Sequence, residues 1–473
     1  MNATKNPLVV DLDGTLTRSD LLFESVCGLL KLNLFYAFLL PVWLLGGKAN
    51  MKQKIAEKVD LEIELLPWQE EFVAYLRDQK AAGRKLILAT ASNEKYAQQI
   101  ADYFGFFDAV IASDAKTNAS GSRKLAKLKE LLDEQFDYAG NAKIDVAIWQ
   151  QAGSAVVVNP LSGVAAAAAA TGPVEATFDD RKASWKAFVK AIRPHQWLKN
   201  GLIFVPMFLA QAWGDASNWI AIILAFVSFS LCASSVYLLN DMLDMPSDRK
   251  HPTKCKRPFA AGELSIVTGA AGVGLLVLAA FFCAMFVSKY FFVVLFIYYI
   301  VTMAYSTVLK RAALLDVITL ASLYTLRLIA GAAAIYVQLS FWLLAFSMFV
   351  FLSLALMKRY SELLVQASLG RERLAGRAYR AEDLPLLSQL GAASGYLGVM
   401  VLALYVESDD VTRLYSNPQS LWLLCPIMLY WISRMWLLTT RGEMHDDPIV
   451  FTIEDRRTHW MAVIAAISLW GAV

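Results

Sequence analysis

Four polar and acidic side chains stand at the end of a long apolar stretch, and their types and spacing suit metal and phosphate chemistry. They are Asn240, Asp241, Asp244 and Asp248. Spacings of three, four and seven residues put the three carboxylates on one face of a helix, where their oxygens could hold Mg²⁺ against a diphosphate. Acidic groups beside a membrane span are costly and therefore predict a functional site. The alternative is a solvated acidic helix end.

A second set of polar residues recurs near the ends of later apolar stretches. Asp316 and Arg327 lie inside such stretches, where an unpaired charge is expensive, so both are expected to face the interior of a helix bundle. The other members are Tyr305, Lys310, Lys358, Arg359, Tyr360, His445, Asp446 and Asp447. Together they predict a cavity lined by carboxylates and cations, suited to a metal-bound diphosphate and a phosphorylated or lipid-borne second molecule.

The elements that must position these residues are membrane helices. Hydrophobic residues make up 57% of the 473-residue chain and charged residues only 18%, which is too apolar for a soluble protein of this length. Apolar runs long enough to cross about 30 Å of hydrocarbon predict about nine helices. They lie near residues 199–214, 217–239, 266–288, 291–308, 313–336, 341–357, 388–406, 420–439 and 459–473.

Basic residues set the expected orientation of these helices. They concentrate in alternate loops, at residues 240–264, 309–312, 358–386 and 440–458. The positive-inside rule places those loops in the cytoplasm, together with the acidic clusters and the N-terminal segment. We therefore expect a multi-pass protein of the inner (plasma) membrane with cytoplasmic active sites. The net charge of +3 does not indicate a nucleic-acid partner, and the five scattered cysteines predict neither a disulfide framework nor a zinc site.

A different pattern opens the chain. Residues 8–17 form a short apolar strand pattern that ends in Asp11-Leu-Asp13-Gly-Thr. This string resembles the first motif of the haloacid dehalogenase superfamily. In that superfamily the first aspartate attacks a phosphate, the second serves as acid and base, and Mg²⁺ lies alongside. The resemblance implies that Asp11 and Asp13 are the catalytic pair of a phosphatase and also belong to its metal site.

Later stretches resemble the remaining motifs of the same superfamily. Thr90 ends a second apolar strand and is implied to hold the phosphate, while Asn141 and Asp145 match the acidic metal-binding motif. Two positions depart from the pattern. Asn141 stands where an aspartate is usual, and its carbonyl oxygen binds a metal more weakly. Ser120 stands beside the glycine where a lysine is expected, so either Lys124 takes the role of that lysine or the role is lost.

The domain organisation follows from these patterns. Alternating strands and helices in residues 1–165 predict a doubly wound, Rossmann-like parallel sheet of the α/β class. Residues 166–189 contain an alanine run and a Gly-Pro pair, and we expect them to form a linker. Residues 190–473 are expected to form an all-α membrane bundle.

The cap of the N-terminal domain, about residues 17–84, contains an apolar stretch from Val26 to Leu45. This stretch is apolar enough to pass for a membrane span. A crossing there would separate Asp11 from Thr90, which must share one site. We therefore expect a helix or hairpin that lies on the membrane interface. Burial of the stretch inside the cap is the alternative.

Four stretches in the membrane region carry a second resemblance. They are Arg193 to Asn200, Asn240 to Gly262, Arg327 to Gly331 and Lys358 to Glu362. Recurring in this order, they resemble the UbiA superfamily of intramembrane prenyltransferases. The likeness is greatest to its polyprenyl-phosphate (decaprenyl-phosphate) phosphoribosyltransferase branch. The second acidic motif departs from that of the aromatic prenyltransferases, because only Asp316 is present where those enzymes carry a cluster.

The resemblance implies a transferase that joins phosphoribosyl diphosphate to polyprenyl phosphate, with Mg²⁺ as cofactor. Asp244 and Asp248 are implied to be catalytic through the metal, which Asn240, Asp241 and Asp316 would help to hold. The implied substrate-binding residues are Lys199, Asn200, Lys254, Arg257, Tyr305, Lys310, Arg327, Lys358, Arg359 and Tyr360. The N-terminal phosphatase would then remove the 5-phosphate to leave polyprenyl-phosphate ribose.

Other interpretations stay open at the level of sequence. A conventional UbiA prenyltransferase with an aromatic acceptor is weakened by the single Asp316. A non-catalytic N-terminal domain that docks on the membrane is supported by Asn141 and Ser120. A transporter is disfavoured because the acidic clusters lie on one side of the membrane, whereas alternating access needs a midplane site. The length of the polyprenyl chain and homo-oligomerisation also stay open.

Overall fold

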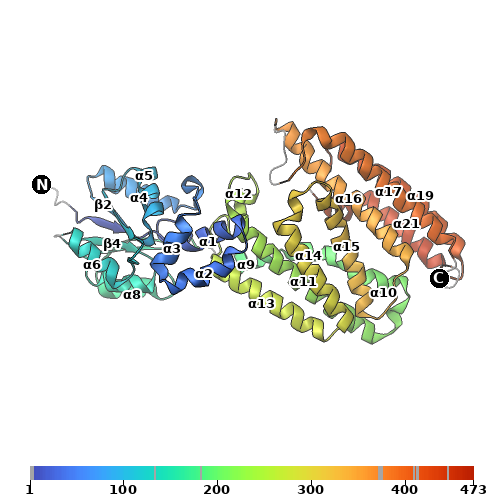
Figure 1. Cartoon of the computed structure of the whole chain (residues 1–473), viewed down its shortest axis with the longest axis horizontal. Coiled ribbons are helices and arrows are strands. Elements are labelled where there is room, and N and C mark those ends of the chain that lie inside the picture. The colour runs from blue at the N-terminus through green and yellow to red at the C-terminus, as the bar shows by residue number, and fades with distance from the viewer. Residues whose placement is uncertain are drawn as a thin grey trace. The chain divides into compact units, whose positions relative to one another are not determined.

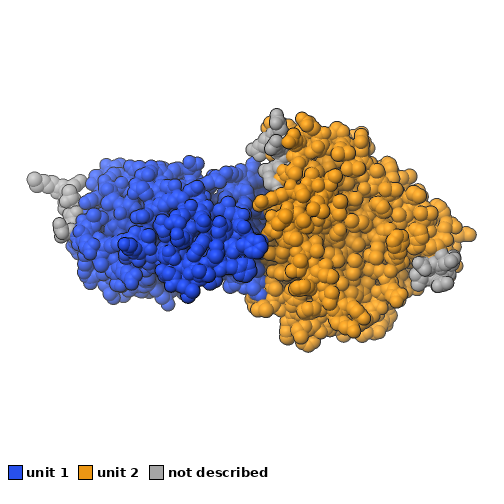
Figure 2. Space-filling view, in the orientation of Figure 1, with its two compact units in different colours: residues 1–193, 237–274 blue, residues 194–236, 275–473 orange. Residues whose placement is uncertain are grey.

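The structure is a computed structural model of the whole chain (Figure 1). It describes residues 5–132, 135–181, 184–370, 377–408, 411, 415–444 and 447–472. The chain divides into two compact units (Figure 2). Unit 1 contains Met1–Arg193 and Tyr237–Gly274, and unit 2 contains Pro194–Val236 and Leu275–Val473. The segment that carries Asp241, Asp244 and Asp248 therefore belongs to the same unit as the N-terminal domain.

Unit 1 is built on a six-stranded parallel sheet with the order β3-β2-β1-β4-β5-β6. The strands are β1 (Leu8–Val10), β2 (Leu86–Asn93), β3 (Ala109–Ser113), β4 (Asp137–Gly140), β5 (Ala155–Val158) and β6 (Val174–Phe178). The strand order reverses between β1 and β4. Open sheets of this kind bind ligands outside the carboxyl ends of the strands at such a switch point. Asp11 follows β1 there, so the sheet predicts a site around it.

Helices cover both faces of this sheet and confirm the predicted doubly wound class. They are α1 (Leu21–Leu32), α2 (Tyr36–Leu45), α3 (Lys48–Ala56), η1 (Ile63–Leu65), α4 (Glu70–Ala81), α5 (Glu94–Phe104), α6 (Ser122–Leu131), η2 (Lys143–Asp145), α7 (Val146–Trp149), α8 (Val164–Thr171) and α9 (Ser184–Ile192). Successive strand residues point to opposite faces. Leu8 and Val10 accordingly belong to one buried cluster with Phe72, whereas Val9 belongs to another with Trp149.

The sheet extends beyond the predicted boundary at residue 165. Residues Val174–Phe178 form β6, which pairs in parallel with β5. The predicted linker 166–189 therefore contributes a strand, most of α8 and part of α9. The alanine run and the Gly-Pro pair have the composition of a linker, but the five alternating residues after them suit an edge strand.

The membrane region consists of long apolar helices. They are α11 (Ala216–Leu243), α13 (Ile266–Met285), α14 (Lys289–Thr307), α15 (Leu315–Ala334), α16 (Phe341–Ser368), α17 (Leu384–Val406) and α19 (Leu424–Thr440). Shorter elements are η3 (Pro194–Phe204), α10 (Val205–Leu209), η4 (Ala212–Gly214), α12 (Met245–Arg249), η5 (Lys254–Lys256), η6 (Leu309–Arg311), η7 (Ala381–Asp383), η8 (Pro418–Leu423), α20 (Pro448–Glu454) and α21 (Arg456–Ala472). Within unit 2, α16, α17 and α19 pack side by side through a shared apolar cluster (Figure 1).

Seven helices are long and apolar enough to cross a membrane in the part of the chain that the structure describes. The prediction of about nine is therefore approximate. The first predicted span, 199–214, is divided among η3, α10 and η4, and the ninth corresponds to α21, which has 17 residues. The length of an apolar run shows whether it could cross a membrane, but the run does not show where the backbone turns within it.

Candidate active sites

The first site forms at the carboxyl end of β1. Asp11 directly follows this strand, and the Lys124 ammonium from α6 donates to its Oδ1 at 2.7 Å. Both side chains are buried. Lys124 also donates to the Tyr138 hydroxyl at 3.1 Å. The structure thus brings to Asp11 the lysine that was predicted to replace the missing one.

Asp13 lies two residues further on and is held by three donors. Its Oδ1 accepts from the Leu21 amide at 2.9 Å, and its Oδ2 accepts from the Ser92 and Thr90 hydroxyls at 2.8 and 3.3 Å. Burial raises the pKa of Asp13 to about 7, and neighbouring acidic charges add to the effect, although the bonds from Leu21 and Ser92 oppose it. A carboxyl group with this pKa is suited to giving and taking a proton near neutral pH.

Asn141 reaches the same loop from the end of β4. A Cβ added to Gly14 would lie only 2.1 Å from Asn141 Nδ2, so the amide packs directly on the loop after Asp13. Gly14 has φ +78°, a conformation that other residues rarely adopt. The predicted metal residue is therefore close to the nucleophile loop, and its packing requires the glycine of the motif.

Asp145 is buried behind Asn141. Its Oδ2 accepts from the amides of Asn141 and Ala142 at 3.0 and 2.9 Å, and its Oδ1 accepts from the Tyr138 hydroxyl at 3.0 Å. Burial, followed by the charge of Asp11, raises the pKa of Asp145 to about 6. Asp145 therefore fixes the loop that presents Asn141 and adds an acidic charge near Asp11.

These residues offer oxygen donors of the kind that Mg²⁺ prefers. The set has a neutral amide at position 141, so it carries less negative charge than a set with a carboxylate there. Among the described residues, no group of three or more His, Cys, Asp or Glu side chains is arranged to hold a metal ion. The donor oxygens of these residues fit a weakly held Mg²⁺.

Lys52 is a residue of this site that the sequence motifs did not indicate. It projects from α3 in the cap and donates to the Ala91 carbonyl at 2.5 Å and to Asn118 Oδ1 at 2.9 Å. Burial lowers its pKa, while the charge of Asp13 opposes that shift. The cap thus adds a second cation beside Thr90 and its neighbours. No local pattern marks this lysine, because only the fold brings α3 over β2.

The second candidate site in unit 1 is the aspartate cluster at the end of α11. Asp241 Oδ1 accepts from Arg193 at 2.5 Å and from Arg257 at 3.1 Å, and Asp248 Oδ2 accepts from Arg257 at 2.7 Å. Asp241 and Asp248 are buried. Two arginines therefore bracket the carboxylates. Arg257 was predicted as a phosphate contact, whereas Arg193 was noted only as the first residue of a matching stretch.

This cluster fits a metal-bound diphosphate by its donor set. The second carboxylate oxygen of Asp241 is buried and has no hydrogen-bond partner. Carboxylate oxygens are ligands for Mg²⁺, and arginine forks suit phosphate oxygens. Asn240 is half-buried, and its carbonyl accepts from the Asp244 amide at 2.8 Å. Lys254 is exposed on η5.

The cap of the N-terminal domain contacts this acidic segment. Lys31, on the last turn of α1, lies 3.5 Å from Asp244. Arg249 donates to both carboxylate oxygens of Glu24, at 2.9 and 2.6 Å, and both side chains are buried. The acidic segment and the cap are therefore joined by ion pairs between residues more than two hundred positions apart.

In unit 2, Asp316 is completely enclosed. The Tyr379 hydroxyl donates to its Oδ1 at 2.5 Å, and Arg359 lies 2.9 Å from its Oδ2. Arg377 lies 3.8 Å from the same oxygen, and Arg359 is also paired with Glu362. The structure thus places both Asp316, a predicted metal ligand, and Arg359, a predicted phosphate contact, in a buried ion-pair network.

Arg327 and Asn200 are also buried and bind each other. Arg327 Nε donates to Asn200 Oδ1 at 2.9 Å, Nη1 donates to the Leu323 carbonyl at 2.6 Å, and Nη2 donates to the Tyr298 hydroxyl at 3.3 Å. Asn200 in turn donates to the Ser230 hydroxyl at 2.9 Å. Arg327 faces the bundle interior as predicted, and each of its nitrogens has a protein partner.

Two further lysines converge on one carboxylate in unit 2. Lys199 forms an ion pair with Asp447, and Lys358 lies 3.7 Å from the same side chain. Asp447 also caps α20 by accepting from the Ile449 amide at 3.1 Å. The neighbours His445 and Asp446 lie outside the described residues. Two positive charges on one carboxylate leave a net cation suited to a phosphate.

The remaining predicted contacts lie around Arg377 and Trp436. Arg377 donates to the Tyr305 hydroxyl at 3.0 Å and to the Lys310 carbonyl at 3.3 Å. Tyr360 packs edge-on against Trp436, with ring centroids 6.1 Å apart. Arg377 is thus a second residue that the sequence analysis did not single out for the site.

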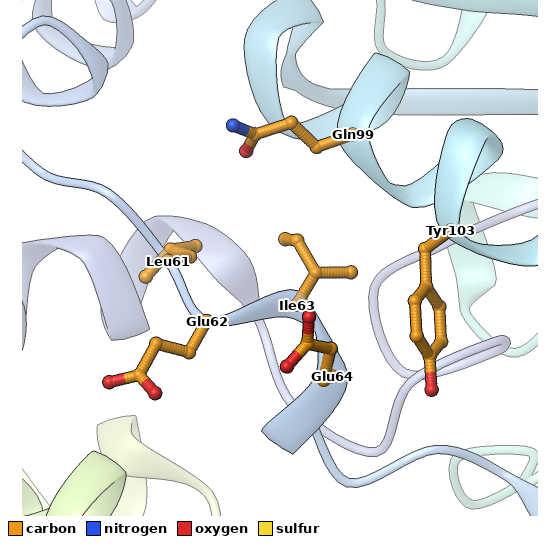
Figure 3. A pocket seen from close by; sticks show the side chains of 6 residues that line it. All are labelled: Leu61, Glu62, Ile63, Glu64, Gln99 and Tyr103. Carbon is orange, nitrogen blue, oxygen red and sulfur yellow. The ribbon is translucent and has the colours of Figure 1, made fainter.

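Each unit contains a cavity. In unit 2, a cavity of about 330 Å³ is lined almost entirely by apolar side chains of η3, α10, α15, α16, α19 and α21, among them Leu328, Phe351 and Met428. In unit 1, a pocket of about 370 Å³ lies between η1 and α5, and Figure 3 shows Glu62 and Glu64 across from Gln99 and Tyr103. The unit 1 pocket contains none of the predicted site residues.

Comparisons with known proteins match both regions of the chain. The haloacid dehalogenase-like hydrolase family matches residues 8–142, and the UbiA prenyltransferase family matches residues 201–461. An uncharacterised protein of Sinorhizobium fredii is 35% identical over 473 residues, which cover 98% of this chain and 90% of that protein.

Two further comparisons concern the membrane region. Decaprenyl-phosphate phosphoribosyltransferase of Mycobacterium tuberculosis is 38% identical over 182 residues, which cover 37% of this chain and 59% of that enzyme. A UbiA homolog from Archaeoglobus fulgidus, solved with GPP and Mg²⁺, covers 60% of this chain and 98% of its own at 15% identity, with a TM-score of 0.46.

The match to the UbiA family spans more than half of the chain, and the apolar helices indicate a multi-pass membrane protein. The chain therefore belongs to the UbiA prenyltransferase family and carries a haloacid dehalogenase-like hydrolase domain before its membrane region.

Proposed function

We propose that the chain catalyses two consecutive steps on a polyprenyl phosphate lipid. The membrane domain transfers 5-phosphoribose from phosphoribosyl diphosphate to polyprenyl phosphate. The N-terminal domain then removes the 5-phosphate to leave polyprenyl-phosphate ribose. The observation that carries this proposal is the carboxylate cluster of Asp241 and Asp248 bracketed by Arg193 and Arg257. The likeness to decaprenyl-phosphate phosphoribosyltransferase supports the choice of substrates.

In the transfer step, the bond between the anomeric carbon and the diphosphate breaks as a bond to the lipid phosphate forms, with inversion at carbon. Asp241, Asp244 and Asp248 would hold Mg²⁺, which neutralises the leaving diphosphate when it is bound. Arg193 and Arg257 would bind the diphosphate oxygens. The ribosyl oxocarbenium ion that develops is stabilised by the carboxylates. The acceptor phosphate is already anionic and needs no general base.

Unit 2 offers groups for the lipid. The apolar cavity of about 330 Å³ between membrane helices suits part of a prenyl chain. Lys199 and Lys358 keep a net positive charge beside Asp447 and suit the phosphate of the acceptor. The buried network of Asp316 and Arg359 would position α15 and α16 rather than bind a metal directly.

In the hydrolytic step, Asp11 would attack the 5-phosphate and Asp13 would give its proton to the departing ribose oxygen. Water would then attack the aspartyl phosphate and give a proton to Asp13, which frees Asp11 and releases inorganic phosphate. Lys124 and Thr90 would hold the phosphate, and Asn141 and Asp145 would complete the metal site. The product of the first step is a phosphomonoester, which is the substrate class of this second site.

The test of the transferase step is the release of diphosphate from phosphoribosyl diphosphate by membranes that contain the full chain. Asp244→Asn and Asp248→Asn should each abolish Mg²⁺-dependent release, because each removes a charge from the metal site. Asp215→Asn, at the opposite end of α11, is the matched control and should keep full activity. Asp11→Asn should also keep this step.

Substrate choice decides between this proposal and the conventional one. Wild-type membranes should consume phosphoribosyl diphosphate in the presence of polyprenyl phosphate. Consumption of an allylic diphosphate and an aromatic acid, but not of phosphoribosyl diphosphate, would overturn the transferase assignment.

A further inference from the structure

Helix α2 and the turn before it present a continuous apolar face to the outside of unit 1. None of the ten residues of α2 is buried. Phe35 and Phe38 are each 75% exposed, and Leu45 is 89% exposed. The other exposed apolar residues of this face are Leu32, Leu34, Leu39, Val42 and Leu44. Soluble surfaces rarely expose apolar side chains in such a contiguous group. The structure does not bury this segment inside the cap.

The opposite side of α2 is fixed to the cap. Tyr36, Leu40 and Trp43 pack against a buried cluster that contains Leu29 and Ile55. Asn50 also donates to the Trp43 carbonyl at 3.0 Å. The helix is therefore held in one orientation, and its exposed face results from the fold.

An ion pair just before α2 relates this exposed face to the end of a membrane helix. Lys31 lies 3.5 Å from Asp244, which directly follows the apolar helix α11. Leu32, the first residue of the exposed face, follows Lys31. The face therefore begins beside the residue that follows the apolar helix α11.

Helix α9 of unit 1 also contacts an apolar membrane helix. Phe188 of α9 packs on Gly272 of the apolar helix α13, so closely that an added Cβ there would lie 2.6 Å from its ring. Helix α9 also exposes the side chains of Trp185 and Val189. Aromatic side chains are enriched at membrane interfaces.

We propose that the face formed by Leu32 to Leu45 inserts into the bilayer leaflet at which α11 ends. A ten-residue helix is about 15 Å long, so it can lie in the interface but cannot cross the hydrocarbon. Lys48 is exposed just beyond α2, and Lys58 lies 5.7 Å from the Tyr36 ring. Their charges suit lipid phosphates. The proposal depends on the membrane helices and not on the reaction assigned above.

The experiment measures the surroundings of a nitroxide label on the full chain reconstituted in vesicles of phosphatidylcholine and phosphatidylglycerol. The two partly exposed cysteines, Cys255 and Cys283, are first replaced by serine. Labels are then placed by Phe38→Cys and, as a second variant, by Leu45→Cys. Leu131→Cys, at an exposed position at the end of α6 in the same unit, is the matched control.

Collision rates with oxygen and with a water-soluble nickel complex report the result. Labels at positions 38 and 45 should collide mainly with oxygen and about fivefold less with nickel than the label at 131, because oxygen concentrates in the bilayer. Nickel access at 38 and 45 equal to that at 131 would overturn the proposal. Protection from both reagents would also overturn it, since a protein partner would then cover the face.

Discussion

The surroundings of Asp13 predict how the rate of phosphomonoester hydrolysis depends on pH. Burial raises its pKa to about 7, so it carries a proton below that pH and loses it above. A general acid must hold its proton when the substrate arrives. We therefore expect kcat/KM for phosphomonoester hydrolysis to fall about tenfold per pH unit above pH 7. The measurement is phosphate release by the full chain in detergent across this range, at saturating Mg²⁺.

Ser92 provides the matched variant for this expectation. Its hydroxyl donates to Asp13 at 2.8 Å and lowers the pKa of that carboxyl. Ser92→Ala should therefore raise the pKa and move the fall in rate to higher pH, whereas Asp13→Asn should abolish turnover. A fall that stays at the same pH in Ser92→Ala would contradict the assignment of Asp13 as the acid.

At the scale of residues, a motif predicts what lies within a few positions along the chain. Asp11 and Asp13 follow the first strand directly, so their geometry is set locally, and the meeting of Asp11 with Lys124 could be anticipated from the order of the motifs. Lys52 and Arg377 could not, because each reaches its site from an element with no motif of its own. Asp316 was predicted as a metal ligand, but its enclosure by Arg359 depends on the packing of α15 against α16.

At the scale of elements, α1 and α12 are joined by the buried ion pair of Glu24 and Arg249. Glu24→Gln leaves the buried arginine without its charged partner, although its Nε still donates to the Ala260 carbonyl at 3.0 Å. Loss of the charged partner costs about 3–5 kcal/mol. The segment from residue 245 to residue 262 should then open more often, and its amide hydrogen exchange should rise by roughly a hundredfold to a few thousandfold. Mass spectrometry of the exchanged full chain measures this protection.

The exposed pair of Lys250 and Glu62 is the control for that experiment. Their side chains are 57% and 49% exposed, and such pairs contribute about 1 kcal/mol or less. Lys250→Met should therefore leave the exchange of the segment almost unchanged. Equal effects of Lys250→Met and Glu24→Gln would show that the buried pair does not hold α12 to α1.

Predictability from sequence also differs among elements. Continuous apolar runs in the sequence predict both the strands of the sheet and the long membrane helices. Strand β6 lies inside the expected linker, because the alanine run and the Gly-Pro pair before it have the composition of a linker. The apolar run at 199–214 was read as one span, although its backbone forms short turns around α10. Hydropathy gives the length of a run but not its internal turns.

At the scale of the whole molecule, the sequence suggests a boundary near residue 190 between the soluble and membrane domains. The contacts instead group Tyr237–Gly274 with the N-terminal region. The pairs of Lys31 with Asp244 and of Glu24 with Arg249 account for this grouping. Ion pairs between residues this far apart leave no local pattern, so the sequence could not predict that the cap contacts the acidic segment.

The central claim is that one chain makes a phosphorylated lipid and then dephosphorylates it. The most direct test supplies vesicles of the full chain with polyprenyl phosphate and phosphoribosyl diphosphate labelled in its 5-phosphate. The lipid products of the wild type and of Asp11→Asn are then compared by mass spectrometry, and released phosphate is counted. The variant removes only the proposed nucleophile of the N-terminal site.

Wild type should yield polyprenyl-phosphate ribose and free labelled phosphate. Asp11→Asn should accumulate the 5-phosphorylated lipid and release no labelled phosphate, because the transfer step does not use this residue. Identical lipid products from the two proteins would contradict the hydrolytic step and would leave the N-terminal domain as a module that docks on the membrane.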